Sequence, residues 1–324
     1  MQLVARGAIE QYCFDVPILF LTNDLCSDHY PGRQHPERPE RLSAVQEGAV
    51  LSDLGSSLVY VEAEPIERKE ILQVHDDGFI EELERINAQG GGRIDPDTKM
   101  SEHTWAAARI SAGAGIQAVR ELTEGSYEAS FCAVRPPGHH AEKNKAMGFC
   151  CISNAGVATN YLVSRYKYKR IACVDFDVHW GNGNYDVMRN NKNSLYISTH
   201  QYPFYPGGGT DKDKGDFNNS LNIPLPAGTN SEQYFNAFDR VLDRLIEYKP
   251  DFLLFSAGFD AHMDDPLAQF QLSSKDFYEI TKRTLKATNE FTQGKVVSIL
   301  EGGYDLNALA ESANEHVNAL IEFN

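Results

Sequence analysis

The chain has few cysteines, no long apolar run near its start and little positive charge, and each shortage excludes a class of protein. None of its six cysteines forms a C-x-x-C pair, and most lie in apolar runs as small core residues do. This argues against a disulfide scaffold and predicts a reduced, cytoplasmic protein. The longest apolar run near the N-terminus, residues 16–21, is too short to cross a bilayer, and no signal peptide is evident.

Basic residues are outnumbered, with 30 lysines and arginines against 46 aspartates and glutamates, a net charge of −16. Because such a surface repels phosphates, direct binding to nucleic acid is not expected. No repeat, low-complexity tract or linker divides the 324 residues, so residues 1–324 are predicted to form a single domain. Whether that domain forms a homo-oligomer stays open.

Apolar runs alternate with helical patterns along the chain. Strands are predicted within residues 1–21 and at 129–134, 171–176, 194–199, 252–255 and 295–300. Helices are predicted from about Pro39, over 66–86, from a capping Ser101 to 122, over 153–166, from an Asn230/Gln233 capping box to before Pro250, from Ser273 to about 291, and from Asp305 to about 321, with a chain break at glycines 90–92. Continuous apolar strands between helices predict an α/β fold, a three-layer α/β/α domain around a mostly parallel sheet.

The chain is organised around the sequence DFDVHWGNG (175–183), which follows the apolar strand at 171–176. Alternate residues on a strand face the same way, so Asp177 and His179 can aim at one point, which is half of a zinc site. A polar, solvated turn is the simpler interpretation of a lone Asp-x-His. Three further clusters follow other apolar runs: RPPGHH (135–140), SAGFD (256–260) and EGGY (301–304). Ligands bind beyond the carboxyl ends of parallel strands, so these clusters are predicted to share one edge.

Asp177, His179 and Asp260 together offer two carboxylates and one imidazole. Three protein ligands with open positions are typical of a catalytic metal site rather than a structural one. A Zn²⁺ ion held there would polarise a carbonyl and lower the pKa of its water. Taken alone, Asp260 is equally consistent with a helix cap.

The tandem histidines His139 and His140 can transfer protons, since histidine is the side chain most easily tuned near neutral pH. Asp175 and Asn182 are well placed to orient one imidazole each. Tyr304 lies beside two glycines and can donate its hydroxyl to a developing oxyanion. Each of these residues alone reads as a turn or core residue, but four such clusters after strands of one sheet are hard to explain by chance.

From about residue 20 to the C-terminus, the order and spacing of these motifs resemble the zinc-dependent histone deacetylase family. The resemblance is to the class II and bacterial amidohydrolase-like side of the arginase/deacetylase superfamily. The segments that carry it are HPERPERL (35–42), DPDT (95–98), RPPGHH (135–140), GFC (148–150), DFDVH (175–179), SAGFD (256–260) and EGGY (301–304).

The resemblance implies one Zn²⁺ on Asp177, His179 and Asp260, with a structural K⁺ near Asp175, Asp177, His179 and Ser198. It implies that His139 and His140 are the proton-transfer pair and that Tyr304 polarises the carbonyl. By position, the resemblance implies that Phe149 and Tyr205 form the wall of a tunnel for the acyl-lysine stem. It implies that Asp97 contacts the substrate backbone at the rim and that Gly148 offers its carbonyl to the substrate amide. It also implies that Arg41 lines a channel for released acetate.

Four sequence features refine the resemblance. Asn182 replaces the aspartate of class I members, which favours the class II side. His262 follows Asp260 by two residues and either supports its loop or approaches the metal. The chain lacks the Asp-x-Asp pattern of arginases, which disfavours a binuclear manganese ureohydrolase. Leu267 stands where polyamine-selective relatives tend to carry an acidic gatekeeper. The expected reaction is therefore hydrolysis of acetyl-lysine in peptides or proteins, with acetylated polyamines as the alternative substrate and a non-catalytic acyl-lysine binder as a weaker alternative.

Overall fold

The computed structural model describes residues 17–51 and 57–323, so Cys13 and the strands expected before residue 17 lie outside the described residues. An eight-stranded sheet runs through the molecule in the order β2-β1-β5-β10-β9-β6-β7-β8, and each of its pairings is parallel. Its strands are β1 (Ile18–Thr22), β2 (Leu58–Glu62), β5 (Ala129–Ala133), β6 (Ile171–Asp175), β7 (Ser194–Gln201), β8 (Ser220–Leu225), β9 (Phe252–Ala257) and β10 (Val296–Leu300).

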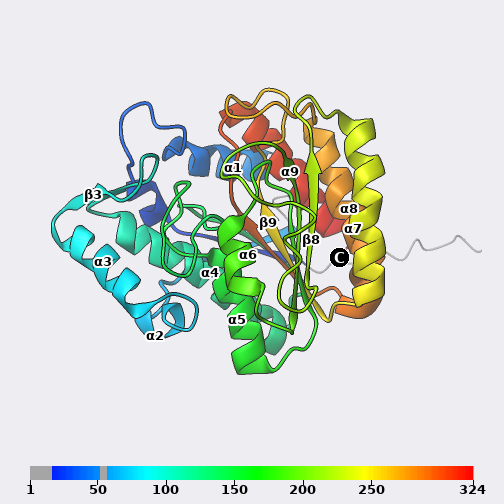
Figure 1. Cartoon of the computed structure of the whole chain (residues 1–324), viewed down its shortest axis with the longest axis horizontal. Coiled ribbons are helices and arrows are strands. Elements are labelled where there is room, and N and C mark those ends of the chain that lie inside the picture. Colours follow the sequence, from blue (N-terminus) through cyan, green and yellow to red (C-terminus); the bar gives the residue numbers. More distant parts are fainter. Residues whose placement is uncertain (1–16, 52–56, 324) are drawn as a thin grey trace, which may run out of the picture.

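Helices cover both faces of this sheet. On one face α8 and α9 pack together with α1 and α7, and on the other α4 packs against α5, as the separation of the yellow-to-red and green-to-teal helices in Figure 1 shows. Every residue of β5, β6, β7, β9 and β10 is buried, which confirms the three-layer α/β/α prediction. The helices are α1 (Glu40–Leu51), α4 (Thr104–Glu124), α5 (Asn154–Tyr166), α6 (Asn182–Met188), α7 (Ser231–Tyr248), α8 (Ser274–Thr292) and α9 (Leu306–Phe323).

Four elements correct the prediction for residues 66–101. The expected helix over 66–86 is two helices, α2 (Arg68–Ile71) and α3 (Asp77–Ala88). The chain leaves the helix between them because His75 anchors it: its Nδ1 donates to the Glu142 carbonyl (2.9 Å) and its Nε2 accepts from the Ser153 amide (3.0 Å). Glycines 91 and 92 do not break the chain but pair in an antiparallel hairpin of β3 (Gly91–Arg93) and β4 (Lys99–Ser101).

Ser101 therefore ends a strand and is not the N-cap of the following helix, which was wrong in the prediction. Its amide donates to Thr104 Oγ1 (2.7 Å), and α4 begins only at Thr104. Three other predicted helix starts are confirmed. Asn230 and Gln233 form a capping box, Ser273 forms one with Asp276, and Asp305 Oδ1 accepts from the Ala308 amide (2.9 Å).

The strands that matter for the site are adjacent in the middle of the sheet. β5, β10, β9 and β6 are neighbours, and Asp175 pairs with Ser256 while Leu300 pairs with Ala257. Their carboxyl ends therefore lie level, and the loops that follow them leave from one edge of the sheet. This is the crevice position where parallel sheets bind ligands.

Candidate metal centre and active site

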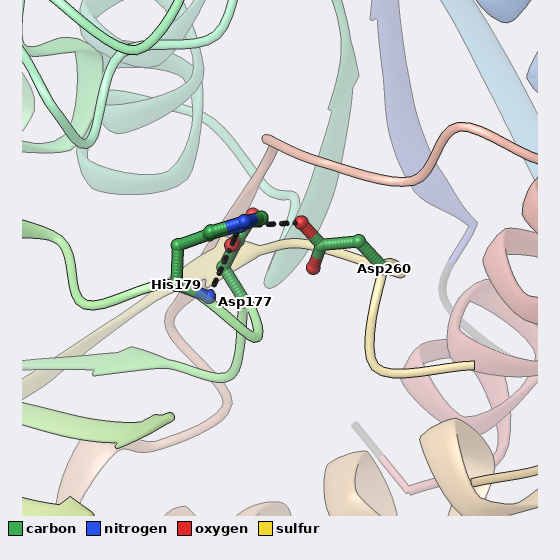
Figure 2. Close-up of side chains that lie close together, drawn as sticks. All are labelled: Asp177, His179 and Asp260. Carbon is green, nitrogen blue, oxygen red and sulfur yellow. Dashed lines mark hydrogen bonds and ion pairs between the residues drawn. The ribbon is translucent and has the colours of Figure 1, made fainter. Parts of the chain in front are cut away.

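Three buried side chains from two of these loops converge at the sheet edge. Asp177 and His179 follow β6, Asp260 follows β9, and the ligand atoms of all three lie within 4.8 Å of one another. The His179 Nδ1 atom lies 3.1 Å from Asp177 Oδ1 and 2.9 Å from Asp260 Oδ2, as the dashed lines in Figure 2 show. This arrangement is a set of two carboxylates and one imidazole around one point.

A tight turn, rather than the alternation of a strand, brings Asp177 and His179 together. The strand β6 ends at Asp175, before both Asp177 and His179, so neither residue lies on the strand that the alternation argument needs. The His179 amide then donates to Asp177 Oδ1 (2.9 Å), while the amides of Val178 and Gly302 donate to Asp260 Oδ1 and Asp177 Oδ2, both at 2.9 Å. Main-chain donors from two loops thus fix the orientation of both carboxylates.

The same loops leave room for these carboxylates only because they carry glycines. A Cβ atom on Gly302 would lie 2.4 Å from Asp260 Oδ2 and 2.5 Å from Asp177 Oδ2. A Cβ atom on Gly258 would lie 2.1 Å from Asp177 Oδ2. Both glycines are needed for close approach of the backbone to the ligand group.

The electrostatics of the group suit a divalent cation. Burial opposes protonation of His179, but its hydrogen bonds to Asp177 and Asp260 outweigh that effect and raise its pKa to about 10. Burial and the charge of Asp177 raise the pKa of Asp260. Two buried carboxylates thus attract positive charge to this point, and two oxygens plus one nitrogen with open positions match the ligand set of a catalytic zinc site.

The tandem histidines lie beside the ligand group with a matched partner each. The rings of His139 and His140 are 4.0 Å apart. The Nδ1 of His139 lies 3.3 Å from Asp175 Oδ2, and the Nδ1 of His140 lies 2.7 Å from Asn182 Oδ1. Because Asn182 Nδ2 donates to a carboxylate, its Oδ1 is an acceptor, so His140 carries its proton on Nδ1 and leaves Nε2 free.

The two partners give the histidines opposite charge preferences. Burial opposes charge on His139, but the carboxylates of Asp177 and Asp175 outweigh it and hold its pKa well above the usual range. Burial and the positive charges of His139 and His179 hold the pKa of His140 well below that range. The pair therefore combines one cationic and one neutral imidazole.

Aromatic side chains flank the histidines and Tyr304. Phe149 contacts the ring of Tyr304 edge-on with centroids 5.9 Å apart, and Tyr205 contacts that of His140 in the same way at 5.3 Å. Tyr304 is 8% exposed and Tyr205 is 37% exposed. The aromatic pair therefore extends from the buried histidine and tyrosine toward the surface.

Residues predicted to contact the substrate are hydrogen-bonded to one another and to neighbouring loops. Asp97 Oδ1 accepts from the amide of Gly148 (3.1 Å), and the Tyr205 hydroxyl also bonds to Asp97. Leu267 donates its amide to Asp265 Oδ1 (2.9 Å). Arg41 also contacts Tyr304, with its guanidinium carbon 4.9 Å from the ring centroid, and its Nε donates to the Gly303 carbonyl (2.6 Å).

Three residues beside the site had been given no role from the sequence. The ring of Phe204 stacks on His179 with centroids 5.1 Å apart and an interplanar angle of 19°. Glu301 Oε2 accepts from the amides of Gly138 (2.6 Å) and His139 (3.0 Å). Asp265 Oδ2 accepts from the Tyr304 amide (2.7 Å), and burial followed by the charge of Asp260 raises the Asp265 pKa to about 7. Only Glu301 lay in a motif that the sequence had singled out.

His262 takes the supporting role of its two alternatives. Its Nδ1 accepts from the Asp264 amide (3.2 Å), and its Nε2 lies 3.2 Å from Ser274 Oγ. Both ring nitrogens are therefore occupied within the β9–α8 loop and at the start of α8. Ser198, assigned to the structural cation by resemblance, bonds through Oγ to His200 Nδ1 (2.9 Å).

A parallel sheet with helices on both faces and a buried Asp/His/Asp group at its carboxyl edge defines an α/β protein with a candidate metal site. The model of the histone deacetylase domain matches residues 35–320, and the chain belongs to that family. It is therefore a hydrolase with the deacetylase or amidohydrolase activity of the family, which is generally zinc-dependent.

The chain is also similar over most of its length to individual proteins and to a solved structure. An uncharacterised protein of Synechocystis sp. is 36% identical over 90% of this chain and 96% of its own length. A probable deacetylase of Archaeoglobus fulgidus is 32% identical over 88% and 81%, and a histone deacetylase-like amidohydrolase of Pseudomonas aeruginosa is 34% identical over 83% and 72%. The crystal structure of the HDA15 HD domain superposes with a TM-score of 0.88 at 30% identity, covering 94% of this chain and 91% of that one. Within residues 17–51 and 57–323, no helix is long and apolar enough to span a membrane.

Proposed function

We propose that the protein hydrolyses the N-acetyl amide of acetyl-lysine in peptides or proteins, with one Zn²⁺ per chain held by Asp177, His179 and Asp260. The observation that carries the proposal is the convergence of the ligand group with the histidine pair. The His140 ring lies 5.9 Å from the His179 ring, and His139 Nε2 lies 3.7 Å from Asp177 Oδ2. Proton-transfer groups at that range of a metal ligand set suit hydrolysis of an amide.

The chain's own residues divide the proton transfers. Zn²⁺ bound by the three ligands supplies a Lewis acid for the amide carbonyl and makes the attacking water more acidic. His140 is neutral with a free Nε2, so it accepts the proton of that water. The cationic His139 stabilises the negative charge that develops beside it, and the pair returns one proton to the leaving lysine amine. The Tyr304 hydroxyl donates to the oxyanion.

The walls of the site favour a narrow, apolar substrate stem. Phe149 contacts the ring of Tyr304 and Tyr205 contacts the ring of His140, and aromatic walls of this kind suit the four methylenes of a lysine side chain. We assign Asp97 to the substrate backbone and the Gly148 carbonyl to the substrate amide. The neutral Leu267 offers no carboxylate for a second ammonium, which favours acetyl-lysine over an acetylated polyamine.

A panel of substrates tests this assignment. The zinc-loaded protein is assayed with an acetyl-lysine peptide and with N-acetylspermidine, alongside protein stripped of metal by a chelator. We expect turnover of the peptide, at least about tenfold lower kcat/KM for the polyamine, and no turnover without metal. Clear preference for the polyamine would replace the substrate assignment, and zinc-loaded protein that turns over neither substrate would favour the acyl-lysine binder.

Three broader assignments accompany this function. We infer a structural K⁺ site from Asp175, Asp177, His179 and Ser198, for which potassium-dependent thermal stability is the test. We infer a reducing, cytoplasmic setting, which the five buried free cysteines among the described residues support. We also treat residues 1–324 as one catalytic domain, for which a single cooperative unfolding transition is the test.

A further inference from the structure

Asp265 is a buried carboxylate that joins two segments of the site. It lies in the loop between β9 and α8 and is 6% exposed. Its Oδ2 accepts from the Tyr304 amide (2.7 Å), and its Oδ1 accepts from the Leu267 amide (2.9 Å). Among the residues that the structure describes, Asp265 forms no ion pair with a basic side chain. Burial of an unpaired carboxylate is unfavourable, so its two amide contacts need a reason.

The segment that carries Tyr304 needs such an anchor. Gly302 and Gly303 precede Tyr304, and Gly303 has a φ of 118°, a region that side chains rarely adopt. The carbonyls of Gly302 and Gly303 are bonded to the Phe259 amide and to Arg41. At Tyr304 itself, the main-chain amide is held by Asp265. This bond adds a fixed point at the residue that carries the phenol, directly after two glycines whose backbone lacks the restriction of a Cβ atom.

We propose that Asp265 is a positioning residue that fixes Tyr304 relative to Leu267, so that the oxyanion donor and the residue at the predicted gatekeeper position keep one geometry. The proposal rests on the proposed function for the roles of Tyr304 and Leu267. A carboxylate suits this task because both of its oxygens accept hydrogen bonds. An asparagine of the same shape has one oxygen, and its amide group would face one of the two N–H donors. Asp265→Asn therefore loses one of the two anchors while conserving volume.

Steady-state kinetics of the zinc-loaded enzyme with an acetyl-lysine peptide test the proposal. We expect Asp265→Asn to lower kcat roughly ten- to hundredfold with a smaller change in KM, because a displaced hydroxyl loses transition-state contacts. The matched control is Asp264→Asn, which removes the same charge from the adjacent residue, whose side chain is 69% exposed. It should change kcat less than about twofold. Equal effects of the two variants would overturn the proposal.

A double-mutant cycle separates positioning of Tyr304 from general loosening of the loop. If Asp265 acts through the phenol, Asp265→Asn should lower kcat no further than about twofold in a Tyr304→Phe background. The same fold loss in both backgrounds would overturn the proposal. Asp265→Glu keeps two acceptor oxygens and should recover part of kcat, whereas a role in packing alone predicts no recovery from the longer side chain.

Amide hydrogen exchange gives a readout that does not depend on catalysis. In Asp265→Asn, exchange should become faster in the segment 301–305 and stay unchanged in the middle of α8. Unchanged exchange at 301–305 would overturn the proposal whatever the substrate. If the parent enzyme turns over no substrate while the exchange result holds, the proposed function fails and the anchor at Tyr304 stands. Variants that do not fold show faster exchange throughout, and Asp265→Glu then takes the place of Asp265→Asn in the exchange measurement.

Discussion

His139 and His140 are neighbours in sequence and in space, yet their surroundings set their charges in opposite directions. Asp177 and Asp175 raise the pKa of His139, while burial and the positive charges of His139 and His179 lower the pKa of His140, whose hydrogen-bond partner Asn182 is a neutral amide. A carboxylate within hydrogen-bond distance favours the imidazolium, while an amide oxygen orients the ring with little effect on its charge. The neutral amide at position 182 adds no countercharge to His140, and this leaves His140 selected as the available base.

This selection predicts the effect of Asn182→Asp. A carboxylate beside His140 should raise its pKa, so that the neutral base forms only at higher pH. The acidic limb of the pH profile of kcat/KM should therefore move upward by about one unit or more. Asn182 also donates to Glu142 Oε1 (2.7 Å), so the substitution is made together with Glu142→Gln to avoid two facing carboxylates. Glu142→Gln alone is the control, and an acidic limb that stays with the control would contradict the assignment of His140.

Phe204 acts on the site through its ring alone. It stacks on His179 at 5.1 Å and restricts the imidazole that completes the ligand group. We expect Phe204→Leu to weaken Zn²⁺ binding roughly two- to tenfold, the equivalent of one aromatic contact, with little change in kcat per bound metal. Phe204→Tyr keeps the ring and should bind as the parent does. Competition with a chelating dye measures the affinity, and equal binding by the leucine variant would show that the stack is incidental.

At the scale of elements, the central strands were predictable and the outer ones were not. The central strands are buried on both faces, so their sequences are continuous apolar runs that predict strands. These strands are β5, β6, β9 and β10. The edge strands β2 and β8 are partly exposed, so their mixed patterns resemble loops. The short helix α6 is rich in glycine and asparagine, which usually mark turns. His75 interrupts a predicted helix by bonding to residues far away in the sequence, and a local sequence pattern does not reveal such contacts.

Part of the candidate site was also predictable from the sequence and part was not. The sequence was sufficient to bring Asp177, His179 and Asp260 to one edge, because all follow strands of one sheet. The contacts of Phe204 and Asp265 were not predictable from the chain alone. They depend on how the β7–β8 and β9–α8 loops fold over the neighbouring strand ends, and loop conformation follows tertiary contacts more than local propensity. The alternation argument reached the correct pair, Asp177 and His179, although a turn is what brings them together.

The loop between β10 and α9 is expected to tolerate no side chain at Gly302. An alanine Cβ there would approach the Asp177 and Asp260 carboxylates within 2.5 Å and push them apart. We expect Gly302→Ala to lose bound metal and to lower activity at least about a hundredfold, as displacement of catalytic groups by about 1 Å does. The control is Gly78→Ala in α3, where an added Cβ meets no atom within 4 Å and alanine favours the helix. Full metal content in Gly302→Ala by elemental analysis would refute the steric argument.

At the scale of the whole molecule, buried charge gathers at the carboxyl edge of the sheet. Glu37 pairs with both Arg41 and Arg135 there, all three fully buried, next to the ligand group's loops. Such groups must be paired, because removing one partner leaves an unbalanced charge in a low-dielectric interior. Between the sheet and α8 and α9, by contrast, lies the buried His316, whose ring nitrogens bond to the hydroxyls of Thr281 and Ser298. Its neutrality makes the stability of the fold depend on pH.

His316 predicts a loss of stability in acid that does not involve the site. It is fully buried, its Nδ1 donates to Thr281 Oγ1 (2.5 Å), and its Nε2 accepts from Ser298 Oγ (2.8 Å). Burial lowers its pKa to about 3, while the unfolded chain has a histidine pKa near ~6.5. Because the folded pKa is the lower one, its contribution is complete above about pH 6.5 and is lost as pH falls toward 3. At pH 5 the loss is about 2 kcal/mol relative to pH 7. We expect His316→Gln to reduce the difference in unfolding free energy between pH 7 and pH 5 by about that amount, measured by urea denaturation of metal-free protein. An unchanged difference would mean that His316 titrates normally in the folded protein, because only a lowered pKa in the core couples its protonation to unfolding.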